Sequence, residues 1–344
     1  MFAQNEITIA ILNRRILKSS SHLKINLSID KLQQNFIMKT LRLDLKYLFV
    51  CIILFSFADI YSQEQGLKVL VVTAHPDDDA SFAGANYKIT HDLNGIVDIA
   101  LITNGEGGYK YSTLAEDIYR LELTDEAIGR KYLPEIRKKE LEAGGNIIGI
   151  RNYYYFNQKD HRYVTSADIK EILDSNIWDL SYIRTELKSI IEKEKYDYVF
   201  VLTPTKTTHA HHSSVGILAL ETISSIDPVN RPLILGGSIA RKNDSVNYVY
   251  KGFEGYPVTT VSDTVPFVFD RTQKFSYKDA LDYKIIVNWV IAEHKSQGTM
   301  QLLMNQGDYE QYWYFDINPE SGKEKTEELF DKLKINYFKK KEYN

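Results

Sequence analysis

The sequence predicts an α/β fold of the Rossmann-like, three-layer kind: a parallel sheet with helices on both faces, followed by a mainly antiparallel β extension. Two observations predict it. Short apolar runs rich in β-branched residues alternate with longer segments that carry apolar residues at helical spacing. Runs that are apolar on both faces are typical of buried parallel strands, and such strands need helical crossovers to connect them.

The first part of this fold is expected within residues 66–230, a Rossmann-like core. Four buried strands are predicted there, at residues 66–73 (GLKVLVVT), 96–103 (IVDIALIT), 152–156 and 198–203 (YVFVLT). Four helices are predicted between and after them, at residues 80–89, 134–148, 178–194 and 213–223. Pro134 is expected in the first turn of its helix, where a missing N–H group does no harm.

The C-terminal third has a different pattern. Residues 233–269 contain several short apolar runs separated by Gly and Asp-Arg turns, which predicts short antiparallel strands. Helices are expected at residues 277–294 and 326–333. Because no long linker and no repeat divides the chain, we predict a single domain over residues 66–344, with 231–344 as its C-terminal extension.

The N-terminal residues have the pattern of a secretory signal. Basic residues follow Met38, and residues 47–58 form an apolar run of 12 residues before Ser62. This run is too short for a membrane span, which needs about 20 residues, but it suits a signal peptide over residues 38–62. Residues 1–37 would then be a wrongly assigned start or a disordered leader. The protein is expected to be secreted or periplasmic, and a short N-terminal membrane anchor is the alternative.

Composition excludes several classes of site. The chain has 42 basic and 46 acidic residues and a formal charge of −4, so nothing favours a nucleic-acid partner, which would require a basic face. Its one cysteine, Cys51, lies inside the predicted signal. No disulfide or thiolate metal site is therefore expected in the mature protein, and any metal must be held by histidine and carboxylate groups.

Two polar clusters directly follow predicted strands. The first is His75-Pro76-Asp77-Asp78-Asp79, after the first strand. Three successive carboxylates repel one another unless a cation lies among them. One aspartate would be enough to cap the following helix, so a metal site explains the cluster better than capping does.

The second cluster, His209-Ala210-His211-His212, follows the fourth predicted strand. Ligands of open α/β sheets bind outside the carboxyl ends of the strands, so both clusters are expected at one edge. Histidine and carboxylate ligands suit Zn²⁺, although Fe²⁺ or Mn²⁺ could also bind. His75, Asp78 and His212 would supply the three protein ligands of a catalytic site.

With these clusters in place, the chain resembles the PIG-L/LmbE-type N-acetylglucosamine deacetylases, which are zinc-dependent. The family's Ala-His-Pro-Asp-Asp-Glu signature appears with Asp79 in place of the glutamate. Four further motifs follow in the family's order, at residues 103–108 (TNGEGG), 137–140 (RKKE), 209–216 (HAHHSSVG) and 294–297 (HKSQ).

The resemblance implies a role for each matching residue. His75, Asp78 and His212 match the zinc ligands, and Asp77 matches the general base. His209 matches the histidine that stabilises the oxyanion and helps to protonate the leaving amine. Contacts to sugar hydroxyls are implied for three further residues, namely Glu106, Arg137 and Asp160. From its own position, Arg137 could instead form a surface salt bridge with Glu140 or Glu142.

Two departures from the family pattern involve the second cluster. His211 replaces an acidic residue that orients the neighbouring histidine in the family. Thr207 occupies a position where some members have a mobile tyrosine.

The implied reaction is removal of the acetyl group from an N-acetylated amino sugar or glycoconjugate. Two alternatives remain open: a metal-dependent esterase or phosphoesterase, and a non-catalytic secreted carbohydrate-binding protein on the same fold. A nucleotide-binding protein is disfavoured because no Gly-x-Gly-x-x-Gly follows the first strand. No stable membrane span is expected in the mature chain.

Overall fold

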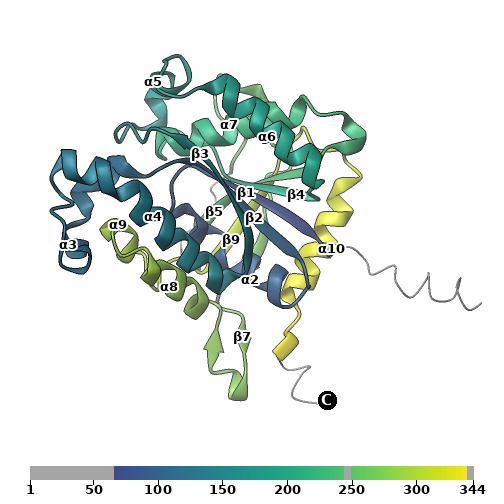
Figure 1. Ribbon diagram of the computed structural model, residues 1–344. Coiled ribbons are helices and arrows are strands. Elements are labelled where there is room, and N and C mark those ends of the chain that lie inside the picture. Colours follow the sequence, from purple (N-terminus) through teal and green to yellow (C-terminus); the bar gives the residue numbers. More distant parts are fainter. Residues whose placement is uncertain (1–65, 244–248, 339–344) are drawn as a thin grey trace, which may run out of the picture. The chain divides into compact units, whose positions relative to one another are not determined.

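The computed structural model describes residues 66–243 and 249–338 (Figure 1). The predictions for residues 1–37 and the signal peptide at 38–62 lie outside the described residues. Within the described ranges, none of the helices combines the length and the apolar character needed to cross a membrane.

The centre of the fold is a seven-stranded sheet with the strand order β3-β2-β1-β4-β5-β9-β6 (Figure 1). Its strands are β1 (Lys68–Thr73), β2 (Ile96–Thr103), β3 (Ile150–Gln158), β4 (Tyr198–Leu202), β5 (Leu233–Ala240), β6 (Phe267–Asp270) and β9 (Tyr309–Tyr314). Strands β1 to β5 run parallel, whereas β9 is antiparallel to both β5 and β6. The predicted α/β fold is confirmed.

Helices cover both faces of this sheet, as predicted. They are α2 (Ala83–His91), α3 (Thr113–Tyr119), α4 (Glu126–Ile148), α5 (Lys170–Leu173), α6 (Leu180–Glu194), α7 (Ala210–Ser224), α8 (Lys284–Glu293), α9 (Gly298–Gln301) and α10 (Gly322–Lys334). One face packs against α6 and α7, and the other packs against α2, α4, α8 and α10.

Strand β1 shows why both faces must be covered. Leu70 and Val72 pack in the core beneath α6 and α7, whereas Val69 and Val71 pack in the core on the other side. All four are 0–1% exposed. Because burial of each such side chain is worth about 1.5–3 kcal/mol, leaving either face open would forfeit several kcal/mol.

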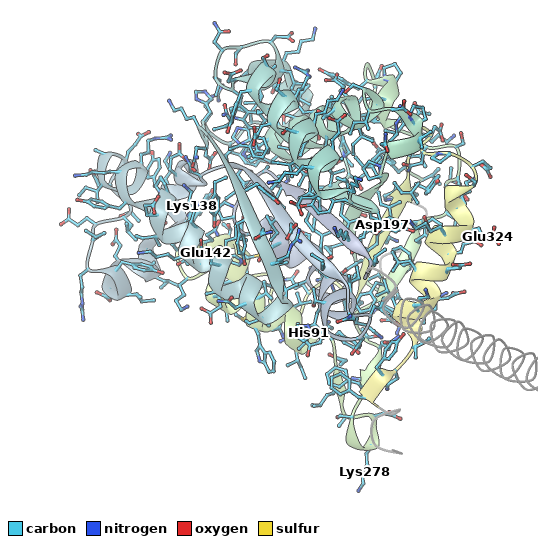
Figure 2. The ribbon with its side chains drawn as sticks, turned by 45° about the vertical axis from the view of Figure 1, so that its right-hand side comes forward. His91, Lys138, Glu142, Asp197, Lys278 and Glu324 are labelled. Atoms are coloured by element: carbon cyan, nitrogen blue, oxygen red, sulfur yellow. The ribbon has the colours of Figure 1, made fainter. Side chains whose placement is uncertain are left out.

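Strand β3 forms one edge of the sheet, and two residues of α4 contact one of its side chains. Lys138 and Glu142 lie one turn apart on α4 and hold the ring of Tyr155 on β3 (Figure 2). The Tyr155 hydroxyl donates to the Glu142 carboxylate at 2.8 Å, and the Lys138 ammonium lies 4.9 Å from the ring centre.

Two core helices begin earlier than the sequence predicted. Helix α4 begins at Glu126 rather than Pro134, because the Asp125 side chain caps it by accepting from the Ile128 N–H at 2.9 Å. Pro134 therefore lies inside the helix. Helix α7 begins at Ala210 rather than residue 213, so His211 and His212 lie in its first turn and His209 is its N-cap.

The C-terminal segment extends the main sheet. Of the antiparallel strands predicted at residues 233–269, β6 is found. The other antiparallel strands lie outside that range, in β9 and in the small hairpin of β7 (Lys274–Phe275) and β8 (Leu281–Asp282). The prediction was wrong for β5, which pairs parallel with β4, and for residues 241–243 and 249–266, which contain no strand. Helix α8 is shorter than the predicted 277–294, because residues 277–283 form a turn and β8. Helix α10 is longer than the predicted 326–333.

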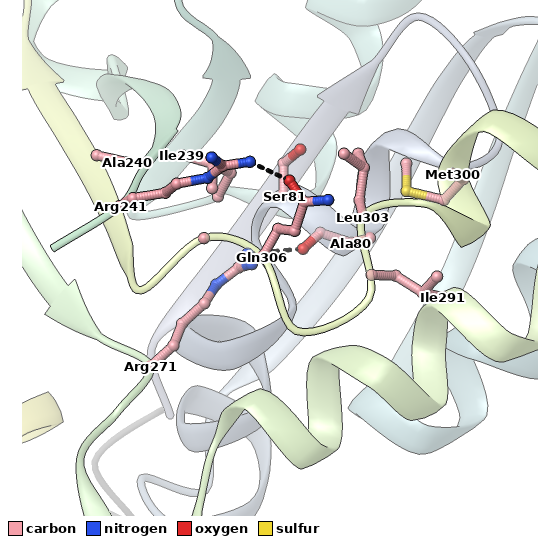
Figure 3. Close-up of a pocket in the computed structure, with 11 residues that line it drawn as sticks. Ala80, Ser81, Ile239, Ala240, Arg241, Arg271, Ile291, Met300, Leu303 and Gln306 are labelled. Carbon is pink, nitrogen blue, oxygen red and sulfur yellow. Dashed lines mark hydrogen bonds between the residues drawn. The ribbon is translucent and has the colours of Figure 1, made fainter. Parts of the chain in front are cut away.

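A buried ion pair fastens these added strands to the start of α2. Glu310 on β9 accepts from the Arg271 Nε at 2.8 Å and from the N–H groups of Gly84 and Ala85 at 2.8 and 3.1 Å. Arg271 also donates to the Ala80 carbonyl at 2.7 Å, at the edge of a pocket of about 260 Å³ (Figure 3). Glu310 thereby satisfies N–H groups that the first turn of a helix leaves without partners.

We predict that Glu310→Ala lowers the free energy of unfolding by about 3–5 kcal/mol, because it leaves the Arg271 charge buried and unpaired. Urea denaturation monitored by circular dichroism measures this change. The control is Glu171→Ala, which removes the partner of Arg162 from an exposed pair and should change stability by no more than about 1 kcal/mol. Equal effects of the two substitutions would contradict the structural role of Glu310.

Candidate metal centre

The two polar clusters meet at the carboxyl ends of β1 and β4, which are neighbours in the sheet. From β1 the chain crosses to α2 on one face, and from β4 it crosses to α7 on the opposite face. This is the switch point of a doubly wound sheet, where diverging connections open a crevice. Residues of the two clusters, 75–79 and 209–212, are in contact there, as the sequence predicted.

Three side chains converge in this crevice with the geometry of a metal site. His75 Nδ1 lies 3.0 Å from His212 Nε2, His212 Nε2 lies 3.1 Å from Asp78 Oδ1, and His75 Nδ1 lies 3.8 Å from Asp78 Oδ2. In a tetrahedral zinc site with bonds of about 2.0–2.2 Å, neighbouring ligand atoms are roughly 3.3–3.5 Å apart. The spacing and the donor set therefore fit a divalent ion.

Each of these three side chains is also held at a second atom. Asp78 Oδ2 accepts from the N–H groups of Ala74 and His75 at 2.9 and 2.8 Å. His212 Nδ1 lies 3.0 Å from the Thr208 hydroxyl, and His75 Nε2 lies 3.0 Å from His211 Nδ1. Such outer contacts determine which atom of each ligand faces the ion.

Charges around the crevice favour an ionised Asp78 and a protonated His75 when no ion is bound. Burial works to raise the pKa of Asp78, but the charge and hydrogen bonds of His212 and His75 hold that pKa well below its usual value. Burial likewise works to lower the pKa of His75. The hydrogen bond to Asp78 and the charges of Asp160, Asp78 and Asp77 outweigh it and raise that pKa to about 9.

The three consecutive aspartates have three different environments. Asp77 does not cap the following helical turn through its side chain, so the capping explanation fails. In the amide orientation that satisfies its neighbours, Gln297 donates to both Asp77 oxygens at 3.1 and 3.2 Å. Asp79 is buried and lies 2.8 Å from His294 Nε2. Residues of the late motif, 294–297, thus hold the side chains of Asp77 and Asp79 in the first cluster.

His209 lies beside the metal ligands and caps α7. Its Nδ1 accepts from the His211 N–H at 3.0 Å, so the ring hydrogen of neutral His209 lies on Nε2. Burial, followed by the charges of His75 and His212, lowers the pKa of His209 to about 2. His209 is therefore neutral and can donate a hydrogen bond from Nε2.

The three predicted sugar-contact residues have different surroundings in the structure. Glu106 and Asp160 lie together: Glu106 Oε1 accepts from the Asp160 N–H at 3.1 Å, and Asp160 Oδ1 lies 3.5 Å from His211 Nδ1. Glu106 Oε2 is buried and has no partner among the described residues. Contact of either residue with a sugar remains a prediction.

Arg137 is buried, which excludes the surface salt bridge considered from the sequence. Its guanidinium donates to the carbonyl of Gly105 and, at 3.1 Å each, to the carbonyls of Gly108 and Ser296. It therefore shapes the loop that carries Glu106, and its own contact with a sugar remains a prediction.

Sequence reasoning missed the roles of Thr208, His211 and Gln297. Thr208 is four residues before His212, a spacing that becomes informative only once the start of α7 is known. Gln297 belongs to a recognised motif, but its contact with Asp77 depends on the packing of α8 against α4 and α2.

Comparisons with known proteins identify similar chains. Residues 70–223 match the PIG-L family profile, described as GlcNAc-PI de-N-acetylase. A Bacillus cereus protein named "Probable N-acetyl-alpha-D-glucosaminyl L-malate deacetylase 2" is 25% identical over 227 residues, covering 63% of this chain and 92% of that protein. The resemblance found in the sequence motifs is confirmed.

Similar solved structures include N,N'-diacetylchitobiose deacetylase from Pyrococcus horikoshii. The match has a TM-score of 0.44 and a sequence identity of 19%. It covers 74% of this chain and 88% of the Pyrococcus horikoshii chain. A second is the A40926 pseudoaglycone deacetylase, with a TM-score of 0.45 and 15% identity over 74% of this chain and 99% of its own.

The raised pKa of His75 makes a prediction about metal binding. Since His75 is protonated below about pH 9 in the ion-free protein, zinc must displace that proton to bind. Zinc affinity should therefore rise about tenfold per pH unit between about pH 7 and 9, with about one proton released per ion. Titration calorimetry in buffers of different ionisation enthalpy counts these protons.

The control for this titration is His91→Ala, which removes an exposed histidine outside the centre (Figure 2) and should leave the proton count unchanged. Binding with no proton release over this pH range would contradict the assigned state of His75.

Proposed function

Because residues 70–223 belong to the PIG-L family, we propose that this protein is a metal-dependent N-deacetylase that removes the acetyl group from an N-acetylated amino sugar. One observation carries the proposal: His75, Asp78 and His212 converge as ligands beside a carboxylate, Asp77, that holds no ligand position. Zinc is the proposed ion, and the same donor set also accepts Fe²⁺ and Mn²⁺.

The reaction follows from the groups around the crevice. A divalent ion held by the three ligands would supply a Lewis acid that polarises the acetyl carbonyl and acidifies the attacking water. Asp77, held by Gln297, takes a proton from this water as its oxygen bonds to the carbonyl carbon. Neutral His209 donates a hydrogen bond from its Nε2–H group to the carbonyl oxygen as negative charge develops there, and it keeps that hydrogen.

Collapse of the intermediate then releases the products. The carbon–nitrogen bond breaks, and the proton held by Asp77 passes to the amine nitrogen. Acetate and a free amino sugar leave. Asp77 serves as the proton carrier in both steps, because the neutral state of His209 leaves it no extra proton to give.

Two features support a sugar as the substrate. The Bacillus cereus relative is named as a deacetylase of an N-acetylglucosaminyl compound. In this chain, Glu106 Oε2 is a buried acceptor with no partner among the described residues, in a cluster with Asp160 and His211. A sugar hydroxyl would satisfy such an acceptor.

The alternatives have less support. Phosphoester hydrolysis usually requires two metal ions, whereas both groups of potential ligands among the described residues share His75. A carbohydrate-binding protein without activity would not need the Asp77 carboxylate. An esterase would use the same site, so comparing acetate release from N-acetyl and O-acetyl sugars separates these two reactions.

We predict that Asp77→Asn lowers kcat by about 10²–10⁴-fold while leaving the metal content unchanged, because only the proton acceptor is lost. Acetate release from N-acetylglucosamine derivatives and metal analysis of the same sample measure both quantities. His212→Ala is the companion variant and should lose the metal as well as activity. Near-normal turnover by Asp77→Asn would refute the assigned base.

The location of the protein outside the cytoplasm is a separate proposal. The signal pattern at residues 38–62 supports export, which would bring the enzyme to an extracytoplasmic glycan. N-terminal sequencing of protein recovered from the native host should give a mature chain beginning near Gln63. A purified chain that retains residues 38–62 would contradict cleavage and favour the membrane-anchor alternative.

A further inference from the structure

We infer that His211 is a positioning residue for the metal centre: its side chain accepts a hydrogen bond from His75 Nε2 and thereby directs His75 Nδ1 to the ion. This inference rests on the proposed metal site and concerns a residue that departs from the family pattern. A buried neutral imidazole would do in this chain what carboxylates or carbonyl groups commonly do behind metal-bound histidines.

The contact between the two rings carries the argument. His211 Nδ1 lies 3.0 Å from His75 Nε2, and the opposite nitrogen of His75 faces Asp78 and His212. A neutral histidine that binds an ion through Nδ1 carries its hydrogen on Nε2. His75 must then donate, and His211 Nδ1 must accept. The hydrogen of His211 then lies on its own Nε2, a buried atom that has no hydrogen-bond partner among the described residues.

The surroundings of His211 hold its ring in place beside His75. Its side chain is fully buried, and its ring packs against Trp178 with the ring centres 5.0 Å apart. Trp178 is fixed in turn, because its Nε1 donates to the Lys159 carbonyl at 2.9 Å.

The Asp160 carboxylate would favour the opposite tautomer of His211, in which Nδ1 carries the hydrogen and donates it. Asp160 is the nearest carboxylate, and its Oδ1 lies 3.5 Å from His211 Nδ1, beyond a good hydrogen bond. Asp160 Oδ2 instead accepts from the Gly107 N–H at 3.0 Å. The lone pair of His211 Nδ1 is therefore available to His75.

The main chain of His211 explains how the acidic residue of the family can be absent. In the family this position orients the neighbouring histidine through a side-chain carboxylate. Here the backbone N–H of His211 binds His209 Nδ1 at 3.0 Å and orients that ring. The His211 side chain is thus free to hold His75, so one residue positions two histidines through different groups.

A matched pair of substitutions tests the hydrogen bond. His211→Leu keeps much of the volume and removes the acceptor, whereas His211→Asn places an amide oxygen near the position of Nδ1. Loss of an outer contact typically lowers metal affinity 10–100-fold. We expect about this loss of zinc affinity in His211→Leu, and a loss of no more than about threefold in His211→Asn, measured by competition with a chromophoric chelator.

The companion variant is Thr208→Val, which removes the equivalent contact of His212 and should weaken zinc binding to a similar degree. If His211→Leu binds zinc as tightly as the wild-type protein, the inference is wrong. Equal losses in His211→Leu and His211→Asn would also overturn it, because volume rather than hydrogen bonding would then matter. Wild-type protein that binds no zinc would instead refute the proposed function.

A measurement on the wild-type chain keeps the test decisive if the leucine variant does not fold. ¹⁵N NMR of the histidine side chains in the zinc-loaded protein reports which nitrogen carries the hydrogen. We expect hydrogen on Nε2 of both His75 and His211, with His211 Nδ1 unprotonated. A hydrogen on His211 Nδ1 would rule out its role as the acceptor.

Discussion

The site depends on one constraint of the sheet: β1 and β4 are parallel neighbours whose connections leave toward opposite faces. The loops that follow them therefore lie side by side. As a result His75 and His212, which are 137 residues apart in the chain, come within hydrogen-bond distance. Burial of both faces of the sheet makes this edge rigid. An ion between the loops would replace the hydrogen bond between His75 and His212 with bonds to all three ligands.

Around the ligands, the recognised motifs form one connected support. Arg137 joins the loop at residues 105–108 to Ser296, and Glu140 accepts from the Ser296 N–H and hydroxyl at 2.8 and 2.7 Å. The same late segment supplies His294 to Asp79 and Gln297 to Asp77. Motifs that are scattered along the sequence thus hold Asp77 and Asp79, the two aspartates on either side of the ligand Asp78.

How much of this could be predicted follows from what the sequence records. Apolar runs such as 69–72 predicted the core strands, because burial on both faces leaves no polar position. The capping aspartate at residue 125 was a visible signal for the start of α4. The start of α7 was not visible, because its N-cap, His209, is outside the usual Ser, Thr, Asp and Asn. The orientation of the His211 side chain could not be predicted without knowing that α7 begins at Ala210.

The parallel pairing of β5 could not be predicted either, because Gly236 and Gly237 interrupt its apolar run. The rings of Phe315 and Phe82 pack closely against the backbone of these two glycines.

The most direct test of the account is anomalous diffraction at the zinc edge from crystals of the metal-loaded protein. The account predicts one peak at about 2.0–2.2 Å from His75 Nδ1, Asp78 Oδ1 and His212 Nε2. A peak on the other side of His75, shared with His209 and His211, would contradict it, as would no peak in the crevice.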